Sequence, residues 1–202
     1  MPGRSLHDLL GPLVAPPTSL DPIAEDVQGI VRRALQRLPG SRRVRGALAG
    51  EWFGHALHPA LTDVPSGAWT LACLFDACDA VGMRSLRRVG DVAIGAGLAA
   101  VPVTAAAGLV DWSVLRGEPR RMGLVHASLN TVASAGYLIS LVERCVGHRG
   151  AGRLWALGAY VMLNLAAYLG GTMVFGTGTA MDEMPEQTSA TPVAPPPEMP
   201  SI

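Results

Sequence analysis

Four apolar segments, each about twenty residues long, constrain the fold of this chain more than any other feature. They run at about 64–83, 91–110, 124–146 and 154–175. A helix needs about 20 apolar residues to cross the hydrocarbon core of a bilayer. The connections between the segments are short, so consecutive helices have to be antiparallel neighbours. The sequence therefore predicts an all-α integral membrane protein, an up-down four-helix bundle surrounded by the lipid bilayer.

A water-soluble four-helix bundle is the alternative. Charged residues make up 16% of the chain, whereas about 25% is usual in soluble domains. The second segment carries no charge between Asp91 and Asp111, which favours the membrane. The first segment is the least apolar, because Asp76 and Asp79 lie near its end. The 16 basic and 16 acidic residues balance, so no nucleic-acid partner is expected.

The regions outside the four segments differ in character. Residues 1–20 are expected to be a flexible N-terminus. Residues 21–50 are expected to form an amphipathic helix and a linker, since Asp21 and Pro22 suit a helix start and apolar residues follow at helical spacing. This helix lies either on the membrane surface or against the protein itself. Residues 51–180 are the expected transmembrane domain, and the Pro-rich residues 181–202 are expected to be a disordered tail.

The arginines bear on orientation. Both ends of the chain fall on one side of the membrane, here called side A, where the first and third segments begin; the opposite side is called side B. The flanks of the segments carry six arginines on side A (Arg42, Arg43, Arg45, Arg116, Arg120, Arg121) and six on side B (Arg84, Arg87, Arg88, Arg144, Arg149, Arg153). Because arginine is enriched on the cytoplasmic side, three more in the amphipathic helix favour cytoplasmic termini in a plasma-membrane protein.

Antiparallel packing brings a set of polar residues to one depth at side A. Its members belong to the ends of different segments, and they are His55, His58, Asp63, Asp111, His126 and Asn130. Further polar residues recur four apart along the last two segments, which places them on single helix faces. Because unsatisfied polar groups are costly in lipid, these faces are expected to turn inward and to set Ser134 near the depth of Asn164.

Two interpretations of this cluster stay open. Imidazoles bind transition metals and haem iron, so His55, His58 and His126 are candidate ligands, with the carboxylates of Asp63 and Asp111 to orient them. In the structural interpretation, which residue types alone favour, Asp63 caps the first helix, His58 and Asp111 tie loops together at the interface, and His126 is a satisfied interfacial histidine. At side B, Asp76, Asp79 and Asp91 are expected to pair with Arg87 and Arg88; a transport role would require the first two to line a cavity.

Several motifs resemble a bacterial membrane family known as domain-of-unknown-function family 2231. The resemblance covers about residues 20–181 and begins with Gly54-His55-Ala56-Leu57-His58-Pro59-Ala60-Leu61-Thr62-Asp63-Val64-Pro65. It continues through Gly67-Ala68-Trp69, Ala107-Gly108-Leu109-Val110-Asp111-Trp112, Arg121-Met122-Gly123-Leu124-Val125-His126-Ala127 and Tyr168-Leu169-Gly170-Gly171. The resemblance implies a four-helix membrane protein, similar to di-haem cytochrome-like bundles, whose relatives are often fused to a Rieske iron–sulfur domain.

This chain departs from the family pattern at three positions. Ala56 replaces a proline, and Thr172 and Thr177 stand where relatives often have histidine or, at the second, arginine. A haem held by histidines of the third and fourth segments is therefore in doubt, and the chain has no Rieske cluster motif. The expected function is an accessory or a haem- or metal-binding component of membrane electron transfer, with a Rieske-type or other redox protein as partner. The alternative is a non-catalytic scaffold with a structural polar core, and no catalytic residue is predicted.

Overall fold

The computed structural model describes residue 11 and residues 13–175, and this part of the chain is helical without strands. Two short 3₁₀ helices, η1 (Thr18–Leu20) and η2 (Arg84–Leu86), accompany the α-helices. These are α2 (Asp21–Arg37), α3 (Ser41–Ala49), α4 (Leu57–Ala80), α5 (Arg87–Trp112), α6 (Gly117–Cys145) and α7 (Arg149–Phe175). The all-α prediction is confirmed, while the tail expected at 181–202 lies outside the described residues.

Three of the described helices are long and apolar enough to cross a membrane. They are the stretches Arg84–Trp112, Gly117–Cys145 and Arg149–Val174. Many of their apolar side chains face outward, such as Val92 at 70% and Leu154 at 72% exposure, as expected of lipid-facing helices. By length and composition, these three helices correspond to the second, third and fourth of the predicted transmembrane segments. The helix of the first segment, α4, has 24 residues and carries Asp63, Asp76 and Asp79, and it is not among these three stretches.

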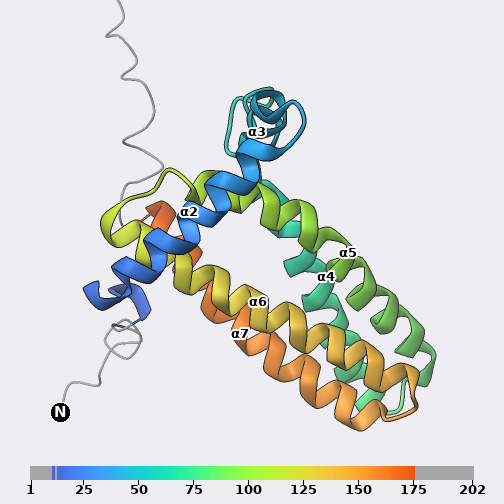
Figure 1. The fold of residues 1–202 in the computed structure, drawn as a ribbon. Coiled ribbons are helices and arrows are strands. Elements are labelled where there is room, and N and C mark those ends of the chain that lie inside the picture. Colours follow the sequence, from blue (N-terminus) through green and yellow to red (C-terminus); the bar gives the residue numbers. More distant parts are fainter. Residues whose placement is uncertain (1–10, 12, 176–202) are drawn as a thin grey trace, which may run out of the picture.

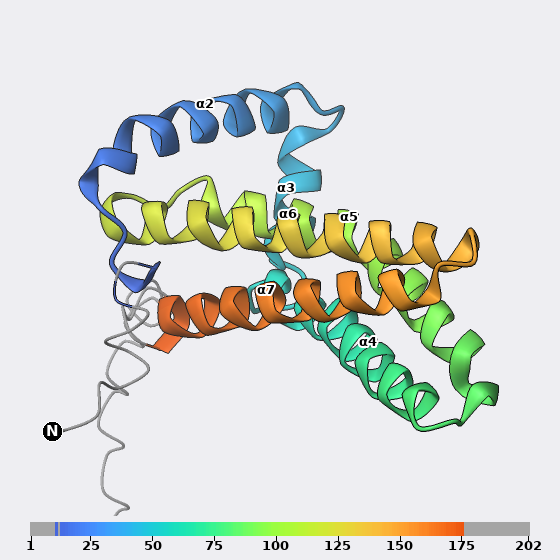
Figure 2. The same ribbon diagram turned by 90° about the horizontal axis from the view of Figure 1, so that it is seen from below.

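The four long helices form two antiparallel hairpins. Helices α4 and α5 pack side by side, as do α6 and α7, and Figure 2 shows the two pairs crossing at an angle (Figures 1 and 2). The short connections between partners explain this pairing. Between the hairpins, α4 and α6 meet through long side chains rather than by close approach of their backbones.

Helix α4 begins at Leu57, seven residues before the predicted start at 64. Pro59 lies in its first turn, where proline is tolerated because no helical hydrogen bond is lost. Pro65 lies inside the helix and cannot donate to the carbonyl of Leu61; the hydroxyl of Thr104 on α5 donates to this oxygen instead, at 3.4 Å. The structure therefore contradicts Asp63 as the cap of this helix, because it lies in the second turn.

Helix α2 has the predicted start, and it lies along the side A end of α5 and α6 (Figure 2). The buried side chain of Gln28 donates to the carbonyl oxygens of Trp112 and Leu115, at 2.8 and 2.9 Å. Asp21 accepts from Arg120 at 3.0 Å, so α2 is fastened to the protein. Its apolar residues Ile23 and Ile30 are more than half exposed, at 53% and 59%. The helix thus docks through its polar and small side chains and turns apolar ones outward.

Two further features of the N-terminal region were not expected. Residues 41–49, predicted as linker, form the short helix α3. Val14, in the stretch expected to be flexible, is buried against Met122 and Leu169 at the side A end of α6 and α7. The carbonyl oxygen of Pro16 accepts a hydrogen bond from Arg121 Nε at 2.9 Å. Side A is therefore covered by α2 and by the segment before it.

Candidate functional site: a histidine pair between two hairpins

His58 lies in the first turn of α4 and faces α5. Its Nδ1 donates to the carbonyl oxygen of Thr104 at 2.9 Å. One turn further along α5, a Cβ built on Gly108 would lie 2.7 Å from His58 Cε1. No side chain larger than hydrogen fits under this imidazole without displacing it, so Gly108 is what allows the ring to lie on the α5 backbone.

His126 repeats this arrangement in the second hairpin. Its Nδ1 donates to the carbonyl oxygen of Ala166 on α7 at 2.8 Å. A Cβ on Gly170, again one turn along, would lie 3.1 Å from His126 Cε1. In addition, the amide of Asn130 on the same face of α6 approaches His126 Nε2 at 3.1 Å.

The two imidazoles face each other across the hairpins. Their ring centroids are 6.2 Å apart and their planes are nearly perpendicular, at 86°. A carbonyl oxygen can only accept, so the proton of each neutral ring sits on Nδ1 and the lone pair on Nε2. Asn130 therefore donates to His126 Nε2. Metal-binding histidines are commonly oriented in this way, with the second nitrogen bonded to a carbonyl.

The matching environments reflect a repeat in the whole domain. Three pairs join α4 to α6, namely His58 with His126, Trp69 with Tyr137 and Asp76 with Arg144, and the members of each are 68 positions apart. The carbonyls of Thr104 and Ala166, and the glycines 108 and 170, share a second constant spacing. The α6–α7 hairpin is thus a structural repeat of α4–α5, and the histidines are equivalent residues of the two repeats.

The structure brings only part of the predicted cluster together. His58, His126 and Asn130 form one group, whereas His55 is exposed in the loop before α4, with its ring against Phe53 at 6.3 Å. Asp63 is exposed on α4, and Asp111 is half-buried in the last turn of α5. Within residues 13–175, no three His, Cys, Asp or Glu side chains are grouped so that they could hold a metal ion.

Sequence reasoning missed the main feature of side B, which is the buried Arg144 of α6. Its side chain is 1% exposed, and its Nη1 donates to Asp76 Oδ1 on α4 at 2.7 Å and to Asp91 Oδ1 on α5 at 3.1 Å. The predicted pairing is confirmed only for Asp79 with Arg87, at 2.7 Å. One sequence signal could have revealed the pairing of Arg144 with Asp76. A histidine, an aromatic residue and a charged residue have the same spacing in α4 (58, 69 and 76) as in α6 (126, 137 and 144).

Two other side B arginines complete this network. Arg149 of α7 pairs with Asp91, and Arg153 of α7 pairs with Asp79. Asp76 and Arg153 line a cavity of about 210 Å³, while both carboxylates named for transport are engaged in ion pairs. The network therefore ties the two hairpins together at side B.

Hydrogen bonds join the last two helices from His126 to Ala166 and from Ser140 to Gly152, but several polar residues predicted from their spacing to face inward bond within their own helices. Asn164 is exposed, contrary to prediction, and its amide donates to the carbonyl of Tyr160 in its own helix at 2.7 Å. Ser134 and Thr172 likewise donate to carbonyls one turn earlier in their own helices. Such local bonds satisfy a hydroxyl in lipid without a partner helix, which explains why spacing alone was misleading. Thr177 lies outside the described residues.

Comparison with known proteins agrees with this architecture. Residues 54–183 match the family model described as "Predicted membrane protein (DUF2231)". No curated protein and no solved structure matches the chain. The matched region begins just before His58 and includes α4 to α7, with both histidines of the pair. Since it covers more than half of the chain, the protein belongs to the DUF2231 family of predicted membrane proteins.

Proposed function

We propose that the protein binds one haem iron or transition-metal ion between His58 and His126, and that it serves as an accessory component of membrane electron transfer. The observation that carries this proposal is the pair of imidazoles whose Nδ1 atoms are both engaged by backbone carbonyls. Two imidazoles that share one metal, at about 2.1 Å from each nitrogen, have ring centroids up to about 6.5 Å apart. The separation of 6.2 Å lies just inside this limit.

The surrounding residues fit a two-imidazole donor set. Gly108 and Gly170 hold the rings against the helix backbones, which restricts their rotation. Asn130 occupies Nε2 of His126 with a hydrogen bond, and this amide would have to turn away from the nitrogen on binding. A bound haem iron would supply one-electron redox chemistry. His58 and His126 would hold the metal, and the carbonyls of Thr104 and Ala166 would orient the two imidazoles.

The scaffold is the second candidate, and the hydrogen bond from Asn130 favours it. A satisfied imidazole inside a bundle stabilises the fold without any ligand. In this interpretation His58 and His126 are the third tie between α4 and α6, beside the stack of Trp69 on Tyr137 and the pairing of Asp76 with Arg144. A redox partner of the Rieske type belongs only to the first candidate, and its support is the family resemblance.

The proposal also includes the placement in the membrane. We infer that α4 crosses the bilayer beside α5, because its carboxylates Asp76 and Asp79 are matched by arginines of the other helices. With the arginines of α2 included, side A carries nine and side B six. Under the positive-inside rule this supports cytoplasmic termini in the plasma membrane.

The test is the visible absorption spectrum and metal content of the purified protein in detergent. The proposal predicts a Soret band or one bound metal per chain, which is lost in His58→Gln and in His126→Gln. His55→Gln is the matched control, since its imidazole is exposed and lies in the preceding loop. The scaffold is supported instead if the wild-type protein is colourless and metal-free and if His58→Gln and His126→Gln are less stable than the wild type.

A further inference from the structure

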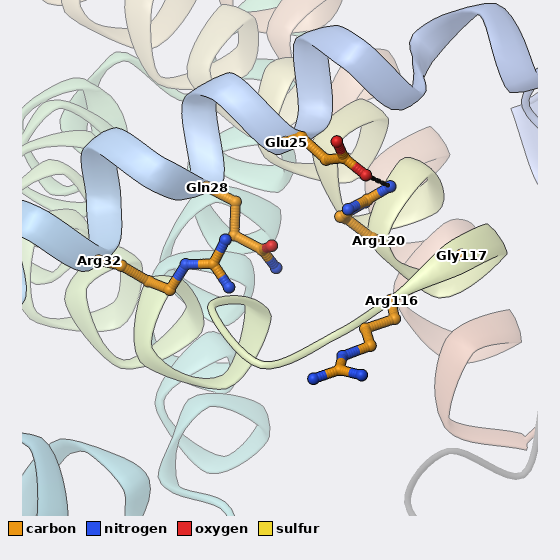
Figure 3. A pocket seen from close by; sticks show the side chains of 6 residues that line it. All are labelled: Glu25, Gln28, Arg32, Arg116, Gly117 and Arg120. Atoms are coloured by element: carbon orange, nitrogen blue, oxygen red, sulfur yellow. Dashed lines mark ion pairs between the residues drawn. The ribbon is translucent and has the colours of Figure 1, made fainter.

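A cavity of about 490 Å³ lies at side A between α2 and the start of α6 (Figure 3). It does not involve the histidine pair. The residues that line it are Glu25, Gln28, Arg32, Arg116, Gly117 and Arg120. Figure 3 shows Arg32 and Arg120 reaching it from the two helices and Arg116 extending from the connection that precedes α6. The lining therefore combines three guanidinium groups with one carboxylate.

The single carboxylate does not neutralise the cavity. Glu25 pairs with Arg120 at 2.8 Å, which leaves the charges of Arg32 and Arg116 uncompensated by any other lining residue. The Arg120 side chain is 11% exposed, and its Nε is buried without a hydrogen-bond partner in the described part of the chain. A buried donor left unpaired is costly, so it marks a place where an acceptor is missing.

The start of α6 adds further donors to the same wall. Gly117 adopts φ of +59°, a conformation that other residues rarely take, and it turns the chain from the loop into the helix. No side chain caps this helix. Pro119 in the first turn has no N–H and Glu118 adds a carboxylate there, so the helix start supplies at most the N–H groups of Gly117, Glu118 and Arg120. The guanidinium groups of Arg32, Arg116 and Arg120 that line the cavity are donors of the kind that a phosphate group accepts from.

The position of the cavity selects the kind of phosphate. It lies where α5 ends and α6 begins, at the boundary of two membrane-crossing stretches. Headgroup phosphates occupy this depth in a bilayer, and anionic lipids attract arginine clusters on the cytoplasmic side. Helix α2 forms the outer wall, and its exposed Ile23 and Ile30 suit a helix that lies at the interface.

We propose that this cavity binds the phosphate headgroup of an anionic membrane lipid, and that Arg32 and Arg116 are its principal ligands. The lipid joins α2 to the membrane domain, in addition to the direct contacts of Asp21 and Gln28. Arg120 contributes through the guanidinium that Glu25 partly occupies. The proposal is independent of any metal at His58 and His126.

Binding of short-chain phosphatidic acid to the full chain in an uncharged detergent tests this proposal, with calorimetric titration as the readout. Saturable binding at one equivalent is expected, weakening as salt is added. Loss of charge-assisted hydrogen bonds in Arg32→Gln/Arg116→Gln should weaken binding by about tenfold or more. Glu25→Gln should strengthen lipid binding several-fold, because it removes the carboxylate that competes with the lipid for Arg120. The ion pair with Asp21 still keeps the Arg120 side chain in place.

Matched controls separate the cavity from general attraction. Arg42→Gln/Arg43→Gln removes the same charge from exposed positions of α3 on side A and should leave the affinity within about twofold. The lipid proposal is overturned if this variant weakens binding as much as the cavity variant does. It is equally overturned if inorganic phosphate binds as tightly as the lipid, which would identify free phosphate as the ligand, or if short-chain diacylglycerol without phosphate does.

Discussion

The indole of Trp69 on α4 stacks on the phenol ring of Tyr137 on α6, with ring centroids 4.2 Å apart and planes within 16° of parallel. Both side chains are almost fully buried, at 2% and 1% exposure. The stack lies between the histidine pair toward side A and the pairing of Asp76 with Arg144 toward side B. It is therefore the central tie between α4 and α6, whose backbones are not in close contact.

Trp69→Ala should destabilise the protein by about 3–5 kcal/mol, because it removes a large buried side chain and leaves a cavity. Tyr137→Phe should be neutral or slightly stabilising, since the Tyr137 hydroxyl is buried without a described partner. Unfolding in detergent by titration with a denaturing surfactant measures both. Equal losses in the two variants would contradict the stacking account.

Arg144→Gln should cost about 3–5 kcal/mol, because the carboxylate of Asp76 would be left buried and unpaired. Arg144→Gln combined with Asp76→Asn should recover part of the loss, since the second change removes the uncompensated charge. Arg88→Gln is the control, as this arginine is exposed on the same side of the bundle. The same unfolding titration applies, and a double variant as unstable as the sum of the singles would show that the two residues do not interact.

Gly170→Ala should destabilise by about 1–3 kcal/mol, because its methyl group would press on the ring of His126. Gly108→Ala should do the same to His58. Gly171→Ala and Gly95→Ala are matched controls on the same helices, with nothing within 4 Å of the added methyl. These should be neutral or stabilising by up to about 1 kcal/mol, since alanine favours helix. Equal effects at both kinds of glycine would argue against packing of the imidazoles on α5 and α7.

The docking of α2 should depend on pH at the acid end. Hydrogen bonding from Arg120 lowers the pKa of Asp21 below its ordinary value. A carboxylate of this kind stabilises the docked state above its ordinary pKa of about 4, and the contribution disappears as the pH falls through the lowered value. The hydrogen-exchange protection factors of the α2 amides, corrected for the intrinsic pH dependence of exchange, should therefore be high at neutral pH and should fall in acid relative to those of α6.

Asp21→Asn should reproduce the acid behaviour at neutral pH and remove most of its pH dependence. Asp26→Asn changes an exposed acid on the same helix and should leave the exchange unaffected. If the two variants behave alike, the ion pair of Asp21 with Arg120 does not hold α2.

Local physics made much of the fold predictable. Short connections and apolar length predicted the helices and their hairpin pairing. The start of α4 was missed because Asp63 suits a helix cap, and only the contact of Thr104 with Leu61 shows how the backbone interrupted by Pro65 is satisfied. The proximity of His58 and His126 could be predicted because antiparallel packing places both residues at the same depth at side A.

The long-range pairs could not be predicted in this way. Arg144 was placed only among the side B arginines, because its partners Asp76 and Asp91 belong to the other hairpin. Only the equal spacing of residues 58, 69 and 76 with 126, 137 and 144 carries that information in the sequence. The grouping of His55 and Asp63 with the pair was expected from their shared depth at side A, but His55 lies in the exposed loop before α4 and Asp63 on an exposed face of α4.

The central claim is that two equivalent imidazoles of the two repeats share one metal centre. Titration of the metal-stripped protein with haem, and separately with Cu²⁺, measures this most directly. The account predicts saturation at one equivalent of one of these ligands for the wild type and for His55→Gln. It predicts no saturable binding for His58→Gln or His126→Gln. Saturable binding that survives loss of either imidazole, or no binding of either ligand by the wild type, would contradict it.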